Sequence, residues 1–208
     1  MRSRVIGLSI LLLAACGRVD RPSPQQPISR PSARETAQCH ADLRAQGVAF
    51  RPLPDRETGP GCGLAGAVQL VDIGVPVTGL TAIRCGEARA FSAWVRNAVA
   101  PAAYQLLGSE LARVETYGSY ACRNVAGRPY RSGHAVANAV DVSGFTLRDG
   151  RRITVLGDWR SADAATQGFW RAVHRSACKR FGTVLSPDYN AAHANHLHLE
   201  DDRASFCR

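Results

Sequence analysis

The chain has 208 residues, of which 45% are hydrophobic and 21% charged, with a formal net charge of +9. This composition is close to that of ordinary globular proteins and excludes a chain that is disordered throughout. No apolar run reaches the roughly 18–20 residues that a helix needs to cross a bilayer, which excludes a multi-span membrane protein. The length predicts one folded domain with an extension.

Residues 1–15 have the pattern of an export signal. A short basic segment precedes an apolar stretch, 5–15, that is too short to span a membrane. The stretch ends in Leu13-Ala14-Ala15-Cys16, which resembles the lipobox of bacterial lipoproteins. That resemblance implies a lipidated Cys16 as the mature N-terminus, with the protein exported, anchored to a bacterial membrane and facing the periplasm. Ordinary cleavage beside an incidental cysteine is the alternative.

The six remaining cysteines fit an oxidising compartment. An even number of cysteines in an exported chain predicts three disulfides, and the sequence leaves their pairing open. None of these cysteines has the Cys-x-x-Cys spacing of a zinc ribbon or a redox motif. We expect neighbours in sequence to pair, with the last pair fixing the C-terminal tail: Cys39 with Cys62, Cys85 with Cys122, and Cys178 with Cys207.

Residues 16–34 form a proline-rich tether without hydrophobic periodicity, and the folded domain occupies 35–208. The run Ser32-Ala33-Arg34-Glu35 is a capping box, which predicts a helix ending at Gly47. The following local patterns predict a strand at 67–71, a helix at 87–99 broken by Pro101, a strand at 111–117, a hairpin of 139–145 with 152–156 around Asp149-Gly150, a helix from 161 to about 181, and a strand at 196–200.

Helices and strands alternate without the regularity of βαβ units. We therefore predict the α+β class, with a small, mainly antiparallel sheet flanked by helices and stabilised by disulfides. The helix at 161–181 buries its inner face through Phe169, Trp170, Val173 and Ala177. Large aromatic side chains are interpreted as core and not as sugar platforms, and these include Trp94, Trp159 and Trp170.

The last predicted strand reads His-Leu-His-Leu-Glu. Alternation along a strand places His196, His198 and Glu200 on one face, because both leucines must face the core. Asp141 stands between two valines and by the same reasoning projects away from the core. With His134 nearby in sequence, the chain offers imidazole and carboxylate ligands of the kind that zinc prefers. The alternative is that each is an ordinary solvated or hydrogen-bonded residue.

The same residues carry a family resemblance. Ser132-x-His134, Asp141 and His196-x-His198 are similar to the signatures of the lysostaphin, D-alanyl-D-alanine metallopeptidase and hedgehog superfamily. A closer resemblance, from about Cys39 to Arg208, is to the bacterial extensin-like protein C-terminal family. The segments that carry it are Cys62-Gly63, Tyr117 to Arg123, Ser132 to Asp141, Phe181 to Asn190, His193 to Leu199, and Cys207-Arg208.

The resemblance implies a zinc site with His134, Asp141 and His198 as ligands. His196 would be the general base that takes a proton from the zinc-activated water, and His193 would be a further histidine beside the site. Arg123 resembles an arginine that holds a substrate carboxylate or polarised carbonyl, although here it follows Tyr120 by three positions and not directly. A superfamily glycine is replaced by Ala137, a small change that keeps the turn.

The implied activity is hydrolysis of the peptide of peptidoglycan at an amide next to D-alanine. The carboxypeptidase branch uses Glu-x-x-His as its base, and Asn195 stands three residues before His198, which favours an endopeptidase. With residues 1–15 removed, 24 basic and 17 acidic residues leave a net charge of +7, which suits an anionic envelope polymer.

The alternative function is a non-catalytic, zinc-containing lipoprotein that binds the envelope or peptidoglycan. Nucleic acid is not an expected partner, because the basic residues are scattered and follow an export signal. We expect a monomer. Asp188 and Asn190 are expected to cap a turn that directs His193 to the site, and His40 and His174 are given no functional role.

Overall fold

The computed structural model describes residues 30–208. The predicted signal peptide, the lipidated Cys16 and residues 16–29 of the predicted tether lie outside the described residues, and the folded domain begins at Ala33, two residues earlier than predicted. The capping box is confirmed: Ser32 caps helix α1 (Ala33–Ala45), and the Glu35 side chain accepts a hydrogen bond from the Ser32 backbone. Within the described part of the chain, no helix is both long enough and apolar enough to span a membrane.

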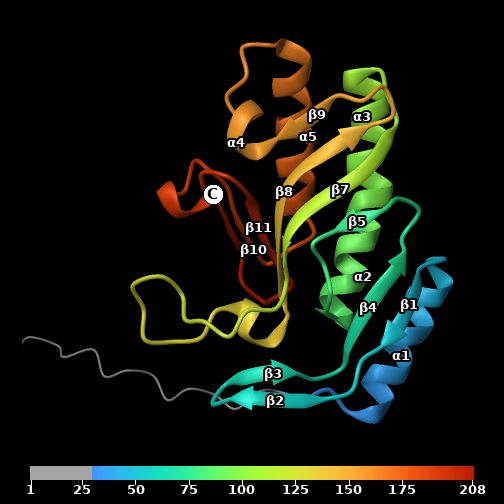
Figure 1. The fold of residues 1–208 in the computed structure, drawn as a ribbon, viewed down its shortest axis with the longest axis vertical. Coiled ribbons are helices and arrows are strands. Elements are labelled where there is room, and N and C mark those ends of the chain that lie inside the picture. The colour runs from blue at the N-terminus through green and yellow to red at the C-terminus, as the bar shows by residue number, and fades with distance from the viewer. Residues whose placement is uncertain (1–29) are drawn as a thin grey trace, which may run out of the picture.

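A seven-stranded sheet runs through the middle of the molecule (Figure 1). From one edge to the other its strands are β12 (Phe206–Cys207), β10 (Thr183–Leu185), β11 (Leu197–Glu200), β8 (Ala139–Leu147), β7 (Leu111–Gly118) and β5 (Val77–Thr78), with β9 (Arg152–Thr154) paired to β8. All neighbouring strands pair antiparallel except β10 with β12 and β5 with β7. The predicted α+β class with a mainly antiparallel sheet is confirmed.

Two smaller antiparallel sheets lie beside α1. One contains β1 (Ala49–Pro52), β4 (Ala67–Asp72) and β6 (Ile83–Arg84), and the other is the hairpin of β2 (Arg56–Gly59) with β3 (Cys62–Leu64). The strand predicted at 67–71 is therefore confirmed as β4. These small sheets extend the fold at the end where α1 packs (Figure 1).

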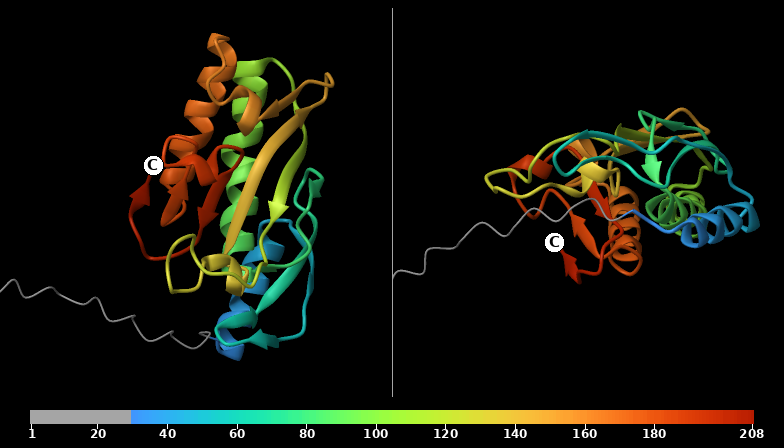
Figure 2. Two further views of the ribbon diagram at one scale, coloured as in Figure 1. Left: turned by 60° about the vertical axis from the view of Figure 1, so that its left-hand side comes forward. Right: turned by 90° about the horizontal axis from the view of Figure 1, so that it is seen from below.

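Helices cover one face of the main sheet, as Figure 2 shows from two sides. They are α2 (Cys85–Trp94), α3 (Ala100–Leu107), α4 (Val155–Asp158) and α5 (Ala164–Cys178). The predicted inner face of α5 is confirmed, since Phe169, Trp170, Val173 and Ala177 are all buried. Trp94 packs there as well, with its ring 6.3 Å from that of Phe145 on β8. The core thus lies between these helices and the sheet, and it leaves the opposite sheet face available for polar residues.

The helix predicted at 87–99 does not break at Pro101. A π-helical segment, η1 (Val95–Val99), joins α2 directly to α3, and the N–H of Ala100 donates to the carbonyl of Val95. Pro101 then occupies the first turn of α3, where its missing N–H and fixed φ are tolerated. In this wider turn the backbone N–H bonds to the carbonyl five residues earlier and not four, immediately before Pro101. The helix therefore continues through the proline.

The hairpin around Asp149-Gly150 is confirmed, and Gly150 adopts the left-handed conformation (φ 89°) that the turn requires. Its second arm is shorter than predicted. β9 ends at Thr154, because the Thr154 hydroxyl accepts a hydrogen bond from the Gly157 N–H and thereby starts α4. Likewise α5 begins after Asp163, whose carboxylate caps it, and not at Ser161.

Three disulfides are present, and two of the three predicted pairings are wrong. Cys39 pairs with Cys85 and Cys62 with Cys122, whereas Cys178 pairs with Cys207 as predicted. Neighbours in sequence are separated here because the β2–β3 hairpin carries Cys62 away from α1. Cys39 on α1 instead meets Cys85 at the start of α2, with 6.2 Å between their Cα atoms.

Candidate metal centre

Strand alternation places two of the predicted ligands side by side. β8 and β11 pair antiparallel with Asp141 directly opposite His198. Their apolar neighbours Val140, Val142 and Leu197 are fully buried in the core, so both polar side chains project from the other face of the sheet. The face assignment drawn from the alternation is confirmed.

His134 reaches the same place from η2 (Gly133–Val136), a single turn of 3₁₀ helix in front of β8. The Ser132 hydroxyl accepts a hydrogen bond from the His134 backbone and caps this turn. Ala137 ends it in the left-handed conformation with φ 54°. The turn expected at this alanine is therefore present, and it presents the His134 side chain to the sheet.

Three potential ligand atoms converge here. His134 Nε2 lies 3.1 Å from Asp141 Oδ1 and 3.1 Å from His198 Nδ1, and the last two atoms are 3.0 Å apart. The far nitrogen of His134, Nδ1, donates to the Ser119 carbonyl at 2.7 Å, which leaves Nε2 as the lone-pair atom that faces the group. Both histidines are buried, and 13% of the Asp141 side chain is exposed. We call these three residues the metal triad.

His196 and His193 stand next to the metal triad. His196 Nε2 lies 3.5 Å from Asp141 Oδ1, and its Nδ1 lies 2.8 Å from the Asn195 side-chain oxygen. The His193 ring is 5.1 Å from that of His196 and 6.0 Å from that of His198. All the predicted histidines are therefore brought together.

The expectation for the turn before His193 is half confirmed. Asn190 caps η3 (Ala191–His193) by accepting a hydrogen bond from Ala192, and its Oδ1 lies 2.7 Å from His193 Nδ1. The Asp188 side chain instead pairs with Arg160, from which it receives a hydrogen bond, and it does not orient His193. Asn190 is thus the residue that orients His193.

Arg123 also reaches the site. Its guanidinium Nη2 lies 3.8 Å from Asp141 Oδ2, and 47% of its side chain is exposed. Although Arg123 follows Tyr120 by three positions, the loop after β7 still brings it to the metal triad. It therefore supplies a positive charge at the open side of the site.

Burial and hydrogen bonding act in opposite directions on the metal triad. Burial raises the pKa of the Asp141 carboxyl, but hydrogen bonds with His134 and His198 outweigh it and hold this pKa far below the usual range. Burial lowers the pKa of His198, and hydrogen bonds to Asp141 and Glu200 reverse this and raise it to about 9. Asp141 is therefore a carboxylate that keeps its charge at neutral pH.

The two flanking imidazoles behave differently. Burial is the largest cause that lowers the pKa of His193 to about 4, and the neighbouring His196 and His198 add to it. Burial likewise lowers the pKa of His196, although the charge of Asp141 opposes the shift. At neutral pH these two rings are neutral and able to accept a proton.

A groove of about 600 Å³ opens beside the metal triad. One wall comes from the loop between β7 and η2 and the other from β10, β11 and the segment around η3. The charged and aromatic residues that line it are Arg123, Arg128, Tyr130, Arg131, Tyr189, His193, His196, His198, Glu200, Asp202 and Phe206. The groove carries the positive charge of Arg123, Arg128 and Arg131 on one wall.

Several residues of the site were not singled out from the sequence. Ser119 acts through its backbone carbonyl, which carries no signal in its residue type. Tyr117 places its ring edge-on to His196, with 6.1 Å between ring centroids. Glu200 was placed on the correct face by alternation, and its Oε2 lies 3.3 Å from His198 Nε2. That alternation was the one available signal for it.

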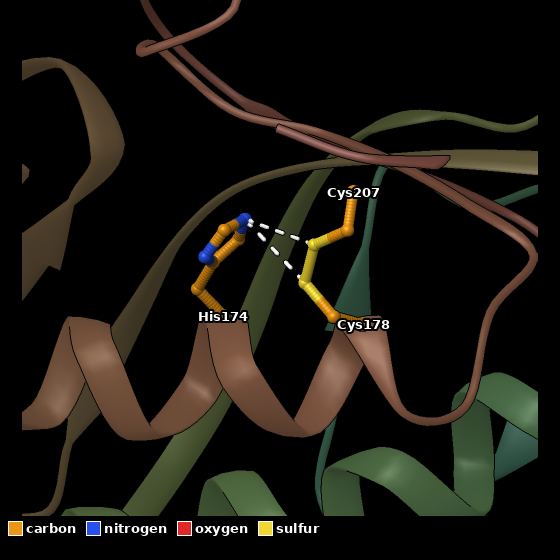
Figure 3. A group of neighbouring side chains, drawn as sticks. All are labelled: His174, Cys178 and Cys207. Atoms are coloured by element: carbon orange, nitrogen blue, oxygen red, sulfur yellow. Dashed lines mark hydrogen bonds between the residues drawn. A yellow bond between two sulfur atoms is a disulfide. The ribbon is translucent and has the colours of Figure 1, made fainter. Parts of the chain in front are cut away.

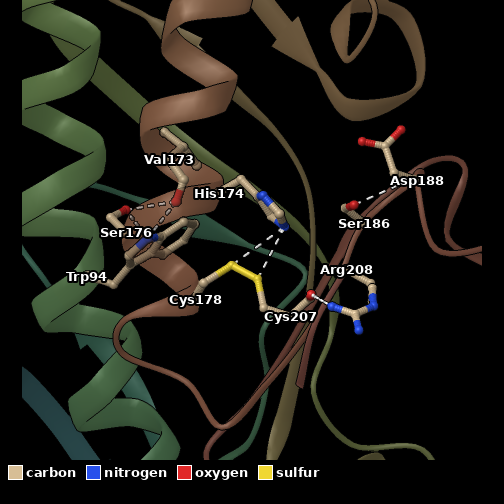
Figure 4. The surroundings of a disulfide bond; sticks show 9 residues. All are labelled: Trp94, Val173, His174, Ser176, Cys178, Ser186, Asp188, Cys207 and Arg208. Atoms are coloured by element: carbon tan, nitrogen blue, oxygen red, sulfur yellow. Dashed lines mark hydrogen bonds between the residues drawn. A yellow bond between two sulfur atoms is a disulfide. The ribbon is translucent and has the colours of Figure 1, made fainter. Parts of the chain in front are cut away.

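A second group of potential ligands lies apart from this site. His174 on α5 faces Cys178 and Cys207, with its Nε2 3.7 Å from each sulfur (Figure 3). Both sulfurs are joined in a disulfide, so neither is a thiolate able to bind a metal. Figure 4 shows this disulfide joining the end of α5 to the C-terminal strand, with Trp94 on one side and Arg208 on the other. Its role is structural.

The comparison with protein families gives one result. No match was found among curated proteins or among solved structures. The family described as extensin-like protein C-terminus matches residues 37–208, a span that begins within α1 and contains every later element and all the site residues above. The chain therefore belongs to the extensin-like protein C-terminal family.

Proposed function

We propose that this protein is a zinc-dependent hydrolase of peptidoglycan peptides, related to the lysostaphin, D-alanyl-D-alanine metallopeptidase and hedgehog superfamily. The observation that carries the proposal is the convergence of His134, Asp141 and His198 within 3.0–3.1 Å of one another at the side of a groove. A second, neutral pair of imidazoles stands beside them. Structural sites have no need of these extra groups.

The chemistry of the donor set fits zinc. Ligands at 2.0–2.2 Å in tetrahedral geometry lie about 3.3 Å from each other, close to the spacing within the metal triad. Two imidazoles and one carboxylate would provide three protein ligands, the number typical of catalytic zinc sites and one fewer than in structural sites. When bound, zinc would supply the Lewis acidity that polarises a carbonyl and acidifies water.

His196 is the proposed general base. Its Nε2 points toward the metal triad, 3.5 Å from Asp141 Oδ1, whereas its Nδ1 is held by Asn195. Held in this way, the imidazole accepts a proton from the attacking water and returns it to the leaving amine. Among the described residues, no carboxylate other than Asp141 and Glu200 contacts the histidines of the site, so an imidazole is the available base.

Arg123 and His193 are proposed to position the substrate. The half-exposed guanidinium of Arg123 lies at the mouth of the groove, where it can receive a carboxylate or the oxygen that gains charge during hydrolysis. His193, oriented by Asn190, faces the same space from the opposite wall. Because Asn195 stands in place of a carboxylate base, we favour an endopeptidase over a carboxypeptidase.

Location is part of the proposal. We place the protein on a bacterial membrane, held by a lipid on Cys16 and facing the periplasm, where peptidoglycan is accessible. The three disulfides support an oxidising compartment. Labelling with a radioactive fatty acid tests this: the chain should take up label and its Cys16→Ala variant should not.

Hydrolysis is tested by mass spectrometry. The protein, purified with its disulfides intact and loaded with zinc, is incubated with defined crosslinked muropeptides, beside His134→Ala and the matched His174→Ala variant. Uncrosslinked products identify an endopeptidase, and free D-alanine identifies a carboxypeptidase. Both activities should vanish in His134→Ala and persist in His174→Ala. If zinc stays bound while nothing is cut, the protein is instead a zinc-containing peptidoglycan-binding lipoprotein.

A further inference from the structure

The Glu200 carboxyl group lies against the Gly133 backbone, in a slot that is open because residue 133 has no side chain. A Cβ built on Gly133 would overlap the Glu200 carboxyl group and lie only 2.6 Å from its Oε2. Gly133 has an ordinary backbone conformation, without the positive φ that favours glycine. The absence of a side chain at this position therefore makes room for the neighbouring carboxylate and is not demanded by the turn.

The carboxylate in this slot contacts the outer nitrogen of a metal ligand. Glu200 Oε2 lies 3.3 Å from His198 Nε2, while His198 Nδ1 faces His134 and Asp141. An acceptor at Nε2 keeps the ring proton on that nitrogen. When a metal replaces the proton on the other ring nitrogen, the lone pair is on Nδ1, the atom that faces His134 and Asp141.

The three consecutive carboxylates at this point of the chain have separate partners. The Asp201 backbone donates its N–H to Glu87 and accepts a hydrogen bond from the Asn138 side chain at its carbonyl. Asp202 receives hydrogen bonds from Thr183 and Ala204. Of the three side chains, only that of Glu200 is hydrogen-bonded to a histidine of the site. A general excess of negative charge therefore does not account for its placement.

We propose that Glu200 is a positioning residue for zinc: held in the Gly133 slot, it orients the His198 ring and fixes the nitrogen that binds the metal. This inference rests on the zinc site of the proposed function and adds a residue to it. Gly133 and Glu200 act as a pair, one by leaving the space and the other by filling it.

Zinc affinity provides the test, measured by competition with a chromophoric chelator and without any peptide substrate. Loss of such an outer contact typically weakens metal binding by about 10–100-fold. We expect that loss in Glu200→Ala, and a smaller loss in Glu200→Gln, whose amide oxygen can still accept. Asp202→Asn is the matched control, since it removes a neighbouring negative charge without touching a ligand, and its affinity should stay within about threefold of the parent.

Gly133→Ala separates positioning from charge. The added methyl group displaces Glu200 without changing net charge, so this variant should also lose zinc affinity by about 10–100-fold. The same substitution made in Glu200→Ala should cost nothing further, because the carboxylate that it displaces is already absent. Cobalt(II) substitution adds a spectral measurement: the visible band should change in Gly133→Ala and not in Asp202→Asn.

The outcomes are distinct. Equal zinc affinity in the parent, Glu200→Ala and Gly133→Ala overturns this inference and leaves the proposed function standing. Additive losses in the double variant overturn the pairing of Gly133 with Glu200. If the parent protein binds no zinc, both the inference and the proposed function fail. Thermal unfolding of the metal-free variants shows whether each one is folded before these comparisons are made.

Discussion

Residues 30–208 contain two groups of three potential metal ligands, and the two groups differ in what holds their donor atoms. In the metal triad, each donor atom lies 3.0–3.1 Å from the other two, and none of them is covalently joined to another. In the group of His174, Cys178 and Cys207, the sulfurs are joined to each other and the imidazole lies 3.7 Å from both. Both groups therefore bring metal-ligating residue types close together. Only in the metal triad are all three donor atoms available to a metal, because the two sulfurs of the other group are bonded to each other.

The surroundings of the two groups of potential ligands also differ. The metal triad borders a groove with further imidazoles and an arginine. The second group joins the end of α5 to the last strand and fastens the C-terminus (Figure 4). We therefore expect changes at the first group to affect metal binding and chemistry, and changes at the second group to affect stability.

The largest expected effect is the removal of a ligand. His134→Ala should abolish stoichiometric zinc binding and reduce hydrolysis to background, because the site loses a buried imidazole on which both neighbours converge. His174→Ala should keep its zinc and its activity. Metal content after dialysis, measured together with muropeptide cleavage, compares the two. Zinc retained by His134→Ala and lost by His174→Ala would reverse the assignment of the two groups.

Loss of the proposed base should separate chemistry from metal binding. His196→Ala is expected to lower kcat by about 10²–10⁴-fold while zinc stays bound, since His196 lies beside the metal triad without belonging to it. A control is Tyr117→Phe, which keeps the ring that packs edge-on to His196. A parallel loss of zinc and activity in His196→Ala would make His196 a ligand and not a base.

Removal of the Cys178–Cys207 disulfide should lower the stability of the fold and leave zinc binding at the metal triad unchanged. The Cys178–Cys207 bond spans 29 positions of the chain. Replacing both cysteines by serine should lower the free energy of unfolding by about 3 kcal/mol through the added freedom of the unfolded chain. Urea unfolding measures this loss, and chelator competition should give the same zinc affinity as in the parent. A large fall in zinc affinity would mean that the two groups are coupled.

The buried carboxyl of Glu87 gives the last test, which is made by varying the pH. Burial raises the pKa of Glu87 well above its ordinary value of 4.5, and the carboxyl accepts a hydrogen bond from the Asp201 backbone. Above about pH 4.5 the unfolded chain loses this proton while the folded chain keeps it. The free energy of unfolding should therefore fall by up to about 1.4 kcal/mol per pH unit, until the folded pKa is reached.

Glu87→Gln should remove that slope. The free energy of unfolding of the variant and of the parent protein is measured by urea titration at pH values from 4.5 upward. The difference between the two should shift in favour of the variant as the pH rises. Zinc affinity should be unchanged, because Glu87 contacts the backbone of Asp201, just after β11, and not a ligand. An identical pH dependence in both proteins would mean that Glu87 is ionised in the folded state.

Much of the fold was predictable from local sequence. The capping box at Ser32, the buried face of α5 and the hairpin at Asp149-Gly150 depend on residues within a few positions of each other, and all three are present. The continuous helix through Pro101 was missed because proline normally ends a helix, and the π-helical turn that accommodates it has no simple sequence pattern.

For the site, the alternation of polar and apolar residues in two strands determined which face His198, Asp141 and Glu200 occupy, since period 2 is a local property of the chain. Only the tertiary structure decided which of these atoms meet. The register of β8 with β11, the pairing of Cys39 with Cys85, and the fit of Glu200 over Gly133 all join segments that are distant in sequence. Such contacts depend on how whole elements pack, and no short-range pattern encodes that packing.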